Sequence, residues 1–179
     1  VPAHSSVNWK LRETANTFIH NAGNARGGDR NGTEAILQSI KHIKSDNIKI
    51  KIRAQHNSYQ QLSDSRLEFD FSNKDFNELW KEGDVFLFPE KWNGLSLPIQ
   101  EAYASGMMIM CGNRFPMNQW LPKEPMIKVD RYLPNSIMPN IPFNAAQYKP
   151  EDIAKKIDQW ANKDIKEYSL MGRAWYEKN

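Results

Sequence analysis

Short apolar runs alternate along the chain with segments whose apolar residues recur at helical spacing. The runs predict strands, because successive side chains of a strand point to opposite faces of a sheet. Apolar residues at steps of three and four predict helices with one buried face. The expected strands cover residues 17–20, 48–52, 67–71, 85–88 and 107–111, and the expected helices begin near residues 33, 76, 98, 150 and 165.

This alternation of strands and helices, with short connections, is typical of an open α/β sheet whose strands are mostly parallel. Residues 85–88, Val-Phe-Leu-Phe, are apolar throughout. A continuous apolar run is expected of a parallel strand that is covered on both faces. The pattern therefore predicts an α/β fold with a Rossmann-like open parallel sheet flanked by helices.

The chain divides into three parts by pattern. Residues 1–16 are polar and irregular and are expected to form a linker or arm, and residues 17–149 are expected to form the Rossmann-like domain. Within it, residues 113–149 hold six of the ten prolines and show few periodic signals apart from one short strand expected at 126–129. Residues 150–179 are expected to form C-terminal helices that pack on the same domain.

Composition narrows the function classes. A chain of 179 residues suits one domain. Hydrophobic residues at 40% and charged residues at 25% exclude disorder for the chain as a whole. A net charge of +3 is too balanced to indicate a nucleic-acid partner, and the single Cys excludes an internal disulfide or a cysteine-based zinc site. No apolar run approaches the roughly 20 residues that span a membrane. Because the chain begins with Val and its last helix is still amphipathic at the end, we expect a piece of a longer protein.

A glycine-rich segment, residues 21–33, follows the first expected strand and leads into a helix. Glycines let the backbone approach a ligand closely, and free N–H groups at a helix start favour an anion. Arg26 and Arg30 add positive charge that can bind a phosphate. Thr33 stands where a Walker A loop has its Lys, and the spacing does not match GxGxxG, so an ordinary NTPase or dinucleotide fold is disfavoured. A turn with solvated arginines is the alternative interpretation.

A second unusual loop, residues 89–102, runs from the strand at 85–88 into the next helix. Gly94 frees the backbone, and the amides of residues 95–97 would form a second phosphate cradle at the start of the helix. Glu101 lies about one turn further, where a carboxylate can accept hydrogen bonds from two neighbouring hydroxyls, as on a ribose. The alternative for Glu101 is a surface carboxylate favoured by the helix dipole.

Residues 84–112, DVFLFPEKWNGLSLPIQEAYASGMMIMCG, resemble the donor-site segment of retaining GT-B glycosyltransferases of the group 1 type. In that family a strand ending in Pro leads to an E-G-F-G-L-P-x-x-E-A-x-A-x-G stretch and then to another strand. The loop at residues 27–33 similarly resembles the basic loop after the first strand of the family's C-terminal domain. The resemblance covers most of residues 17–178 and implies the C-terminal, donor-binding half of a two-domain enzyme. The matching residues are Gly94, Leu97, Pro98, Glu101, Ala102, Ala104 and Gly106.

The resemblance implies roles for individual residues. Glu101 matches the Glu that holds the ribose of the donor, and Asn93 stands where the family has the Glu that contacts the donor sugar. Asn31 occupies the place of the phosphate-binding Lys, so Arg30 would supply the positive charge. Arg30 and Glu101 are therefore the expected catalytic residues. The expected substrate-binding residues are Gly23, Arg26, Gly28, Asn31, Phe71, Asn93, Gly94, Leu95, Ser96, Leu97 and Glu101.

The same resemblance implies the chemistry. The family stabilises the departing diphosphate with basic residues and helix dipoles, so neither a cofactor nor a metal is expected. The expected function is to bind a nucleotide diphosphate sugar for transfer to a sugar, lipid or protein acceptor held by a missing N-terminal GT-B domain of the same parent chain. The isolated chain is then expected to transfer sugar weakly or not at all. The resemblance further implies a cytoplasmic enzyme of carbohydrate biosynthesis, with any membrane association made through the parent protein.

Asn31 and Asn93 leave a second interpretation open, because two charged positions of the family pattern are neutral here. The chain would then be a non-catalytic nucleotide-binding or interaction module with a degenerate glycosyltransferase site. A nucleotide-sugar epimerase would need catalytic carboxylates and a His around the site, and the sequence offers no clear set. A response-regulator-like domain fits worse, since the acidic cluster after its first strand is absent.

Overall fold

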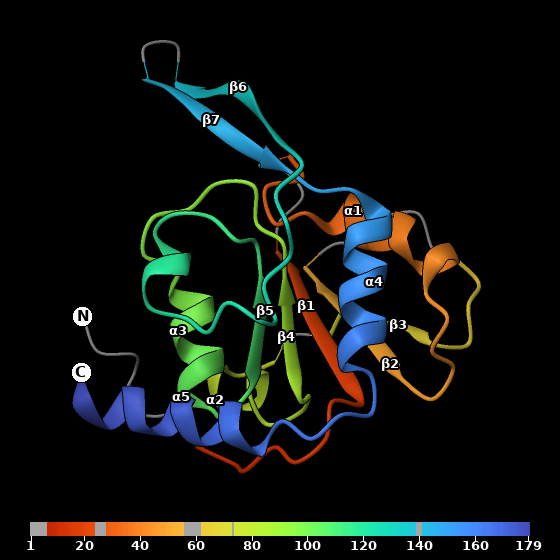
Figure 1. Ribbon diagram of the computed structural model, residues 1–179, viewed down its shortest axis with the longest axis vertical. Coiled ribbons are helices and arrows are strands. Elements are labelled where there is room, and N and C mark those ends of the chain that lie inside the picture. Colours follow the sequence, from red (N-terminus) through yellow and green to blue (C-terminus); the bar gives the residue numbers. More distant parts are fainter. Residues whose placement is uncertain (1–6, 24–27, 56–61, 73, 139–140) are drawn as a thin grey trace.

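The computed structural model describes residues 7–23, 28–55, 62–72, 74–138 and 141–179. Its centre is a sheet of five strands: β1 (Thr17–Gly23), β2 (Lys49–Ala54), β3 (Leu67–Asp70), β4 (Val85–Phe88) and β5 (Met108–Cys111). The strands lie in the order β3-β2-β1-β4-β5, and every neighbouring pair is parallel (Figure 1). The predicted Rossmann-like α/β fold is confirmed.

Helices cover both faces of the sheet (Figure 1). One face carries α1 (Thr33–Ser39), the 3₁₀ turn η2 (Ile40–His42) and α4 (Pro150–Trp160). The other face carries α2 (Phe76–Leu79), α3 (Leu97–Ala104) and α5 (Lys166–Lys178), with the 3₁₀ turn η3 (Met117–Gln119) beside them. None of the helices in the described part of the chain is long and apolar enough to cross a membrane.

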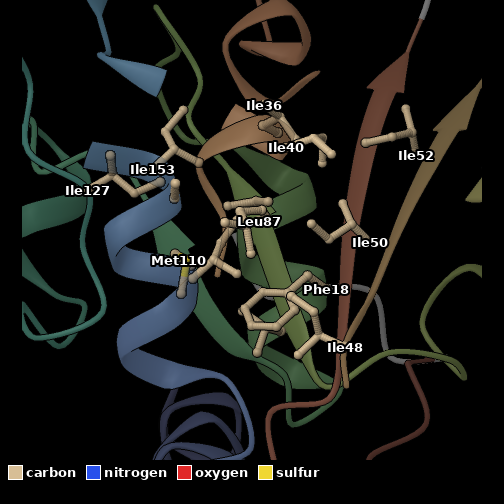
Figure 2. Close-up of a cluster of buried hydrophobic side chains, with 14 of the residues drawn as sticks. Phe18, Ile36, Ile40, Ile48, Ile50, Ile52, Leu87, Met110, Ile127 and Ile153 are labelled. Atoms are coloured by element: carbon tan, nitrogen blue, oxygen red, sulfur yellow. The ribbon is translucent and has the colours of Figure 1, made fainter. Parts of the chain in front are cut away.

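The alternation of strand side chains divides the core into two clusters. Val85 and Leu87 of β4 pack in the cluster on the side of α1 and α4 (Figure 2). Phe86 and Phe88 point the other way and join the cluster on the side of α2, α3 and α5. All four side chains are at most 2% exposed. The continuous apolar run at this strand therefore follows from burial on both faces.

The segment at residues 7–16 lies against the body of the domain. Arg12 is 2% exposed, and its guanidinium donates hydrogen bonds to the carbonyl oxygens of Trp80 (2.7 Å) and Lys81 (3.0 Å). The amide of Ala15 donates to the carbonyl of Lys163 at 3.0 Å. These contacts join the segment both to the connection after α2 and to the connection before α5.

The proline-rich region after β5 differs from the sequence expectation. Residues 126–129 form no strand of the sheet, and Ile127 makes only an isolated parallel bridge to Gly112. Instead, β6 (Arg131–Met138) and β7 (Ile141–Gln147) form an antiparallel hairpin that projects from the body of the domain (Figure 1). The hairpin escaped the sequence analysis because prolines and uncharged polar residues interrupt the apolar alternation by which strands were recognised.

His20 links three elements from inside the fold. Its side chain on β1 is fully buried, with Nδ1 2.9 Å from the Leu87 carbonyl oxygen of β4 and Nε2 2.7 Å from the Thr33 hydroxyl of α1. Because a carbonyl only accepts, Nδ1 carries the proton and Nε2 accepts from Thr33. Burial lowers the pKa of His20 to about 4, outweighing the Leu87 carbonyl and the charge of Asp29. His20 is thus a neutral packing residue.

We expect this histidine to make the fold sensitive to acid. Its pKa is depressed in the folded state, so its contribution is complete above the unfolded pKa of 6.5 and is lost as the pH falls towards about 4. The loss should reach ~3 kcal/mol of unfolding free energy at most, from a shift of this size. Urea unfolding across this range should give a flatter pH dependence for His20→Asn than for the wild type, with His42→Gln as the control. Parallel pH curves for the wild type and His20→Asn would contradict the assignment.

Candidate functional site

The strand order places a topological switch point between β1 and β4. After β1 the chain adds β2 and β3 on one side, and it then returns to place β4 and β5 on the other side. The helices that follow these two strands, α1 and α3, pack on opposite faces of the sheet. In open α/β sheets, ligands bind beyond the carboxyl ends of the strands at such a point.

Hydrogen bonds and an ion pair hold the two loops at the switch point together. The Lys91 amide donates to the Arg30 carbonyl at 2.8 Å, and Arg30 Nε donates to the Trp92 carbonyl at 3.2 Å. Lys91 Nζ lies 2.8 Å from Asp29 Oδ2. Segments that are about sixty residues apart in sequence therefore act as one structural unit.

Gly32 allows the closest approach between these loops. Its φ is +78°, in the left-handed region that disfavours residues with a Cβ. A Cβ at this position would lie 2.2 Å from the Pro89 carbonyl oxygen, well inside contact distance. The backbone conformation and the contact with Pro89 both require glycine here.

Among the described residues of these two loops, Arg30 is a cation without an ion-pair partner. Its side chain is exposed, and no acidic partner within ion-pair distance is found for it among the described residues. Lys91 and Asp29 neutralise each other beside it. The exposed guanidinium is therefore accessible to solvent.

Asn31 does not contribute to an anion site in this conformation. Its side-chain amide donates back to the end of β1, to the carbonyls of Asn21 (2.9 Å) and Ala22 (3.2 Å). Gly23, which ends β1 with a φ of +69°, lies against the same amide, since a Cβ there would be 3.2 Å from Asn31 Nδ2. The position that resembles the family's phosphate-binding Lys therefore holds the strand end in place.

A buried carboxylate organises the loop after β4. Glu90 is 1% exposed, and its Oε2 accepts hydrogen bonds from Asn93 Nδ2 and Ser96 Oγ, both at 3.0 Å. Its other oxygen lies 3.6 Å from Arg114 Nη2. Burial raises the pKa of Glu90, while the charge of Arg114 and the two hydrogen bonds act in the opposite direction. The loop thus folds around one carboxylate.

Two residues from later in the chain hold this loop from outside. Arg114, just after β5, donates to the Asn93 carbonyl at 3.1 Å. The Tyr148 hydroxyl, just after β7, donates to the Glu90 carbonyl at 2.8 Å. Roles for Glu90, Arg114 and Tyr148 were not predicted from the sequence. A charged residue two positions after a buried strand was the available signal for Glu90, whereas nothing in the sequence placed Arg114 or Tyr148 beside it.

The loop after β4 enters α3 through an exposed turn. Ser96 is the N-cap, with a left-handed φ of 47°, and α3 begins at Leu97. Gly94, Leu95 and Leu97 are exposed, so the backbone is accessible here, while Ser96 is buried against Glu90. Glu101 is half-buried one turn further along α3.

Some of the expected residues lie apart from this group. Phe71 follows β3 at the far edge of the sheet and stacks on Phe69, with ring centroids 5.9 Å apart. Two strand spacings separate β3 from β1, or ~10 Å. Gly28 is exposed with a φ of +74°, and Arg26 lies outside the described residues. In the described part of the chain, no cluster of three or more His, Cys, Asp or Glu side chains could hold a metal ion.

Solved structures share this architecture. The C-terminal domain of a glycosyl transferase group 1 family protein (LpcC) from Francisella tularensis superposes with a TM-score of 0.58 at 14% identity, over 89% of this chain and 86% of that one. WaaG, a glycosyltransferase involved in lipopolysaccharide biosynthesis, gives 0.53 at 13% identity over 91% of this chain and 41% of WaaG. The catalytic domain of a cholesterol-α-glucosyltransferase from Helicobacter pylori gives 0.52 at 14% identity, over 92% and 94%.

The chain has the fold of the C-terminal domain of group 1 glycosyltransferases. No protein-family model matches the sequence, and no curated protein matches it either. At this low identity the likeness establishes the fold. It leaves the roles of Arg30, Asn93 and Glu101 to be argued from their geometry.

Gly32 offers a test of the contact between the loops, with Gly28 as a matched control. Both glycines have positive φ, so either Ala substitution costs about 1 kcal/mol for the left-handed conformation. A Cβ at Gly28 has open space, whereas one at Gly32 overlaps the Pro89 carbonyl. We expect Gly32→Ala to lose a further ~2 kcal/mol of unfolding free energy in urea titrations, since the overlap forces a backbone shift. Equal losses for the two variants would show that the loops are not in contact at Gly32.

Proposed function

We propose that the chain is the donor-binding domain of a glycosyltransferase and that it binds a nucleotide diphosphate sugar at the switch point between β1 and β4. One observation carries the proposal. At this point the two loops are joined through Arg30, Lys91 and Trp92, and the exposed guanidinium of Arg30 has no acidic partner among the described residues. The shared fold supports the assignment.

In this proposal the diphosphate lies between Arg30 and the start of α3. The guanidinium would offer charge-assisted hydrogen bonds to phosphate oxygens, and the backbone amides of Leu95, Ser96 and Leu97, at and just before the start of α3, would offer further donors near the positive end of the helix dipole. During transfer the bond between the anomeric carbon and the diphosphate oxygen breaks, while the acceptor oxygen forms the new bond and loses its proton. Fixed donors stabilise the negative charge that grows on the departing diphosphate.

The rest of the donor would lie along the same edge. Glu101, one turn into α3, is proposed to accept hydrogen bonds from the ribose hydroxyls. Asn93 Nδ2 donates one hydrogen bond to Glu90, and its side-chain oxygen Oδ1 is proposed to accept a hydrogen bond from a sugar hydroxyl. Gly23, Gly28 and Gly94 would permit close approach of the backbone, and Phe71 would lie towards the base.

Transfer would require the acceptor-binding half of the protein. The chain spans 41% of WaaG, so much of that enzyme has no counterpart in these residues. We propose that a sugar, lipid or protein acceptor is held by an N-terminal domain of the same parent chain. The domain alone would bind the donor and transfer its sugar poorly.

A specific observation favours a second candidate, a module that has kept the fold and lost the activity. The Asn31 amide is committed to the Asn21 and Ala22 carbonyls, so this position supplies no donor to a ligand in the present conformation. Asn93 likewise brings no charge to the sugar position. Such a module would fold normally and bind no nucleotide diphosphate.

Calorimetric titration with UDP, GDP, ADP and their sugar conjugates tests the proposal. We expect binding of one nucleotide diphosphate, weakened about tenfold or more in Arg30→Ala, because charge-assisted hydrogen bonds contribute ~1.5–3 kcal/mol. Glu101→Ala should weaken the binding of nucleoside diphosphates and leave the binding of inorganic pyrophosphate unchanged, since the proposed partner of Glu101 is the ribose. Arg173→Ala and Glu167→Ala are charge-matched controls on α5, where Glu167 is exposed and Arg173 is half-buried.

Two results would reject the donor assignment. A folded wild type that binds none of the nucleotides, alone and in the full-length parent, would favour the inactive module. Binding that is lost equally in the control variants would mean that the nucleotide associates elsewhere on the protein.

A further inference from the structure

Asparagine is followed by glycine at two places in the sequence, Asn31-Gly32 and Asn93-Gly94. In such a pair the peptide nitrogen of the glycine can attack the side-chain amide of the asparagine, because glycine has no Cβ to hinder the approach and leaves the backbone free to turn. Both pairs lie in the two loops of the candidate site. The structure gives them opposite surroundings, although their local chemistry is the same.

The fold protects Asn31 from this attack. Its side-chain amide donates to the carbonyls of Asn21 and Ala22, at 2.9 Å and 3.2 Å. The Gly32 amide, which would be the nucleophile, donates to the Asp29 carbonyl at 3.3 Å. Gly32 is also buried, with no room at the position of a Cβ. Attack at Asn31 would break these hydrogen bonds in a tightly packed loop.

Asn93 lies in a more open part of its loop. Gly94 is exposed, and the position of a Cβ on it has no atom within 4 Å. Among the described residues, no hydrogen-bond acceptor is found for the Gly94 amide. The Asn93 side chain is held by the hydrogen bond from Nδ2 to Glu90 Oε2 at 3.0 Å. The nitrogen that would attack is therefore not tied to an acceptor in the described structure, and water reaches this residue.

Arg114 favours the same attack electrostatically. The nitrogen of Gly94 attacks as the deprotonated amide, whose negative charge is shared with the carbonyl oxygen of the preceding residue. That oxygen belongs to Asn93, and it accepts a hydrogen bond from Arg114 Nη2 at 3.1 Å. A fixed positive charge beside the oxygen stabilises the anion and therefore favours its formation.

We propose that Asn93 is a site of spontaneous deamidation. A bond forms between Gly94 N and Asn93 Cγ, the bond from Cγ to Nδ2 breaks, and Nδ2 leaves as ammonia with the proton that Gly94 N gives up. Water then opens the resulting five-membered imide. Opening at Cγ leaves an aspartate in a normal backbone, and opening at the backbone carbonyl carbon leaves an isoaspartate. The reaction needs water and no nucleotide, so it stands apart from the proposed function.

The product changes the loop after β4. In the aspartate an oxygen takes the place of Nδ2, which lies 3.0 Å from Glu90 Oε2. Two carboxylates at this distance repel unless one of them holds a proton. Glu90 also accepts from Ser96, the N-cap of α3, so the start of α3 should loosen. If the donor site is confirmed, donor binding would weaken as the protein ages; this consequence rests on the proposed function.

Peptide mapping by mass spectrometry, after incubation at mildly alkaline pH, tests the proposal. Deamidation changes a peptide's mass by the difference between a hydroxyl and an amino group, and fragmentation assigns the change to one asparagine. In the folded chain we expect Asn93 to deamidate at least about tenfold faster than Asn31, because Gly94 keeps the freedom that attack requires. In urea the two should deamidate at similar rates, since the fold that separates them is absent.

Gly94→Ala identifies the nucleophile. The open space around Gly94 accommodates a Cβ, and its φ lies outside the left-handed region, so the variant should fold, which circular dichroism checks. It should slow deamidation at Asn93 by about tenfold, because a Cβ hinders the attack, and leave the rate at Asn31 unchanged. Three results would overturn the proposal: equal rates at the two asparagines in the folded chain, no reaction at Asn93 when the same sequence reacts in urea, and an unchanged rate in Gly94→Ala.

Asn93→Asp measures the effect of the product on the loop. We expect a lower free energy of unfolding in urea than for the wild type, because Glu90 loses a donor and gains a like charge. Asn113→Asp is the matched control, since Asn113 is exposed and its side-chain oxygen accepts from Asn118, as a carboxylate also can. Equal stability of Asn93→Asp and the control would overturn the expected loosening of the loop.

Discussion

Beside β1 the chain places β2 on one edge and β4 on the other, and the helices that follow β1 and β4 cover opposite faces of the sheet. Two loops must therefore start side by side and diverge. Contact at their starts depends on Gly32, where the Pro89 carbonyl leaves no room for a Cβ. That contact brings Arg30 against Trp92 and Lys91 against Asp29. The hairpin also depends on it, because Phe143 and Ala146 are held by the same loop.

The loop after β4 obtains its shape from a buried charge. An isolated carboxylate at 1% exposure would be costly, and Glu90 is accommodated by two hydrogen bonds and by Arg114. Those hydrogen bonds come from Asn93 and Ser96, which makes the left-handed turn at Ser96 part of the solvation of Glu90. Arg114 joins the region after β5 to this loop. Shape at the start of α3 is thus secured by side chains from two regions that are distant in sequence.

The sequence predicted most of the fold, because the spacing of apolar residues reflects which side chains are buried. β4 is apolar throughout since both of its faces are covered, and the switch from alternation to helical spacing marked α1 and α4. Hydrogen bonds and ion pairs between distant segments have no comparable pattern in the sequence. Asn31 was predicted to follow β1, but its side-chain hydrogen bonds to Asn21 and Ala22 have no signature in the sequence. The partnership of Glu90 with Arg114 was missed for the same reason. The hairpin of β6 and β7 was missed for a different one, because prolines and uncharged polar residues interrupt its apolar alternation.

Charge balance decides how the proposed site could hold a diphosphate. Asp29 is compensated by Lys91 and Glu90 by Arg114, so among the described residues of the two loops Arg30 is a cation without an ion-pair partner. One guanidinium does not neutralise a diphosphate. In the proposed site, further stabilisation would come from backbone amides at the start of α3, beside Ser96 and Glu90. Because the residues at positions 31 and 93 are neutral, the proposed site would stabilise a diphosphate more by fixed hydrogen-bond donors than by charged side chains. In the proposed site, Glu90 would act on the affinity without contacting the ligand, because it holds Ser96 at the start of α3.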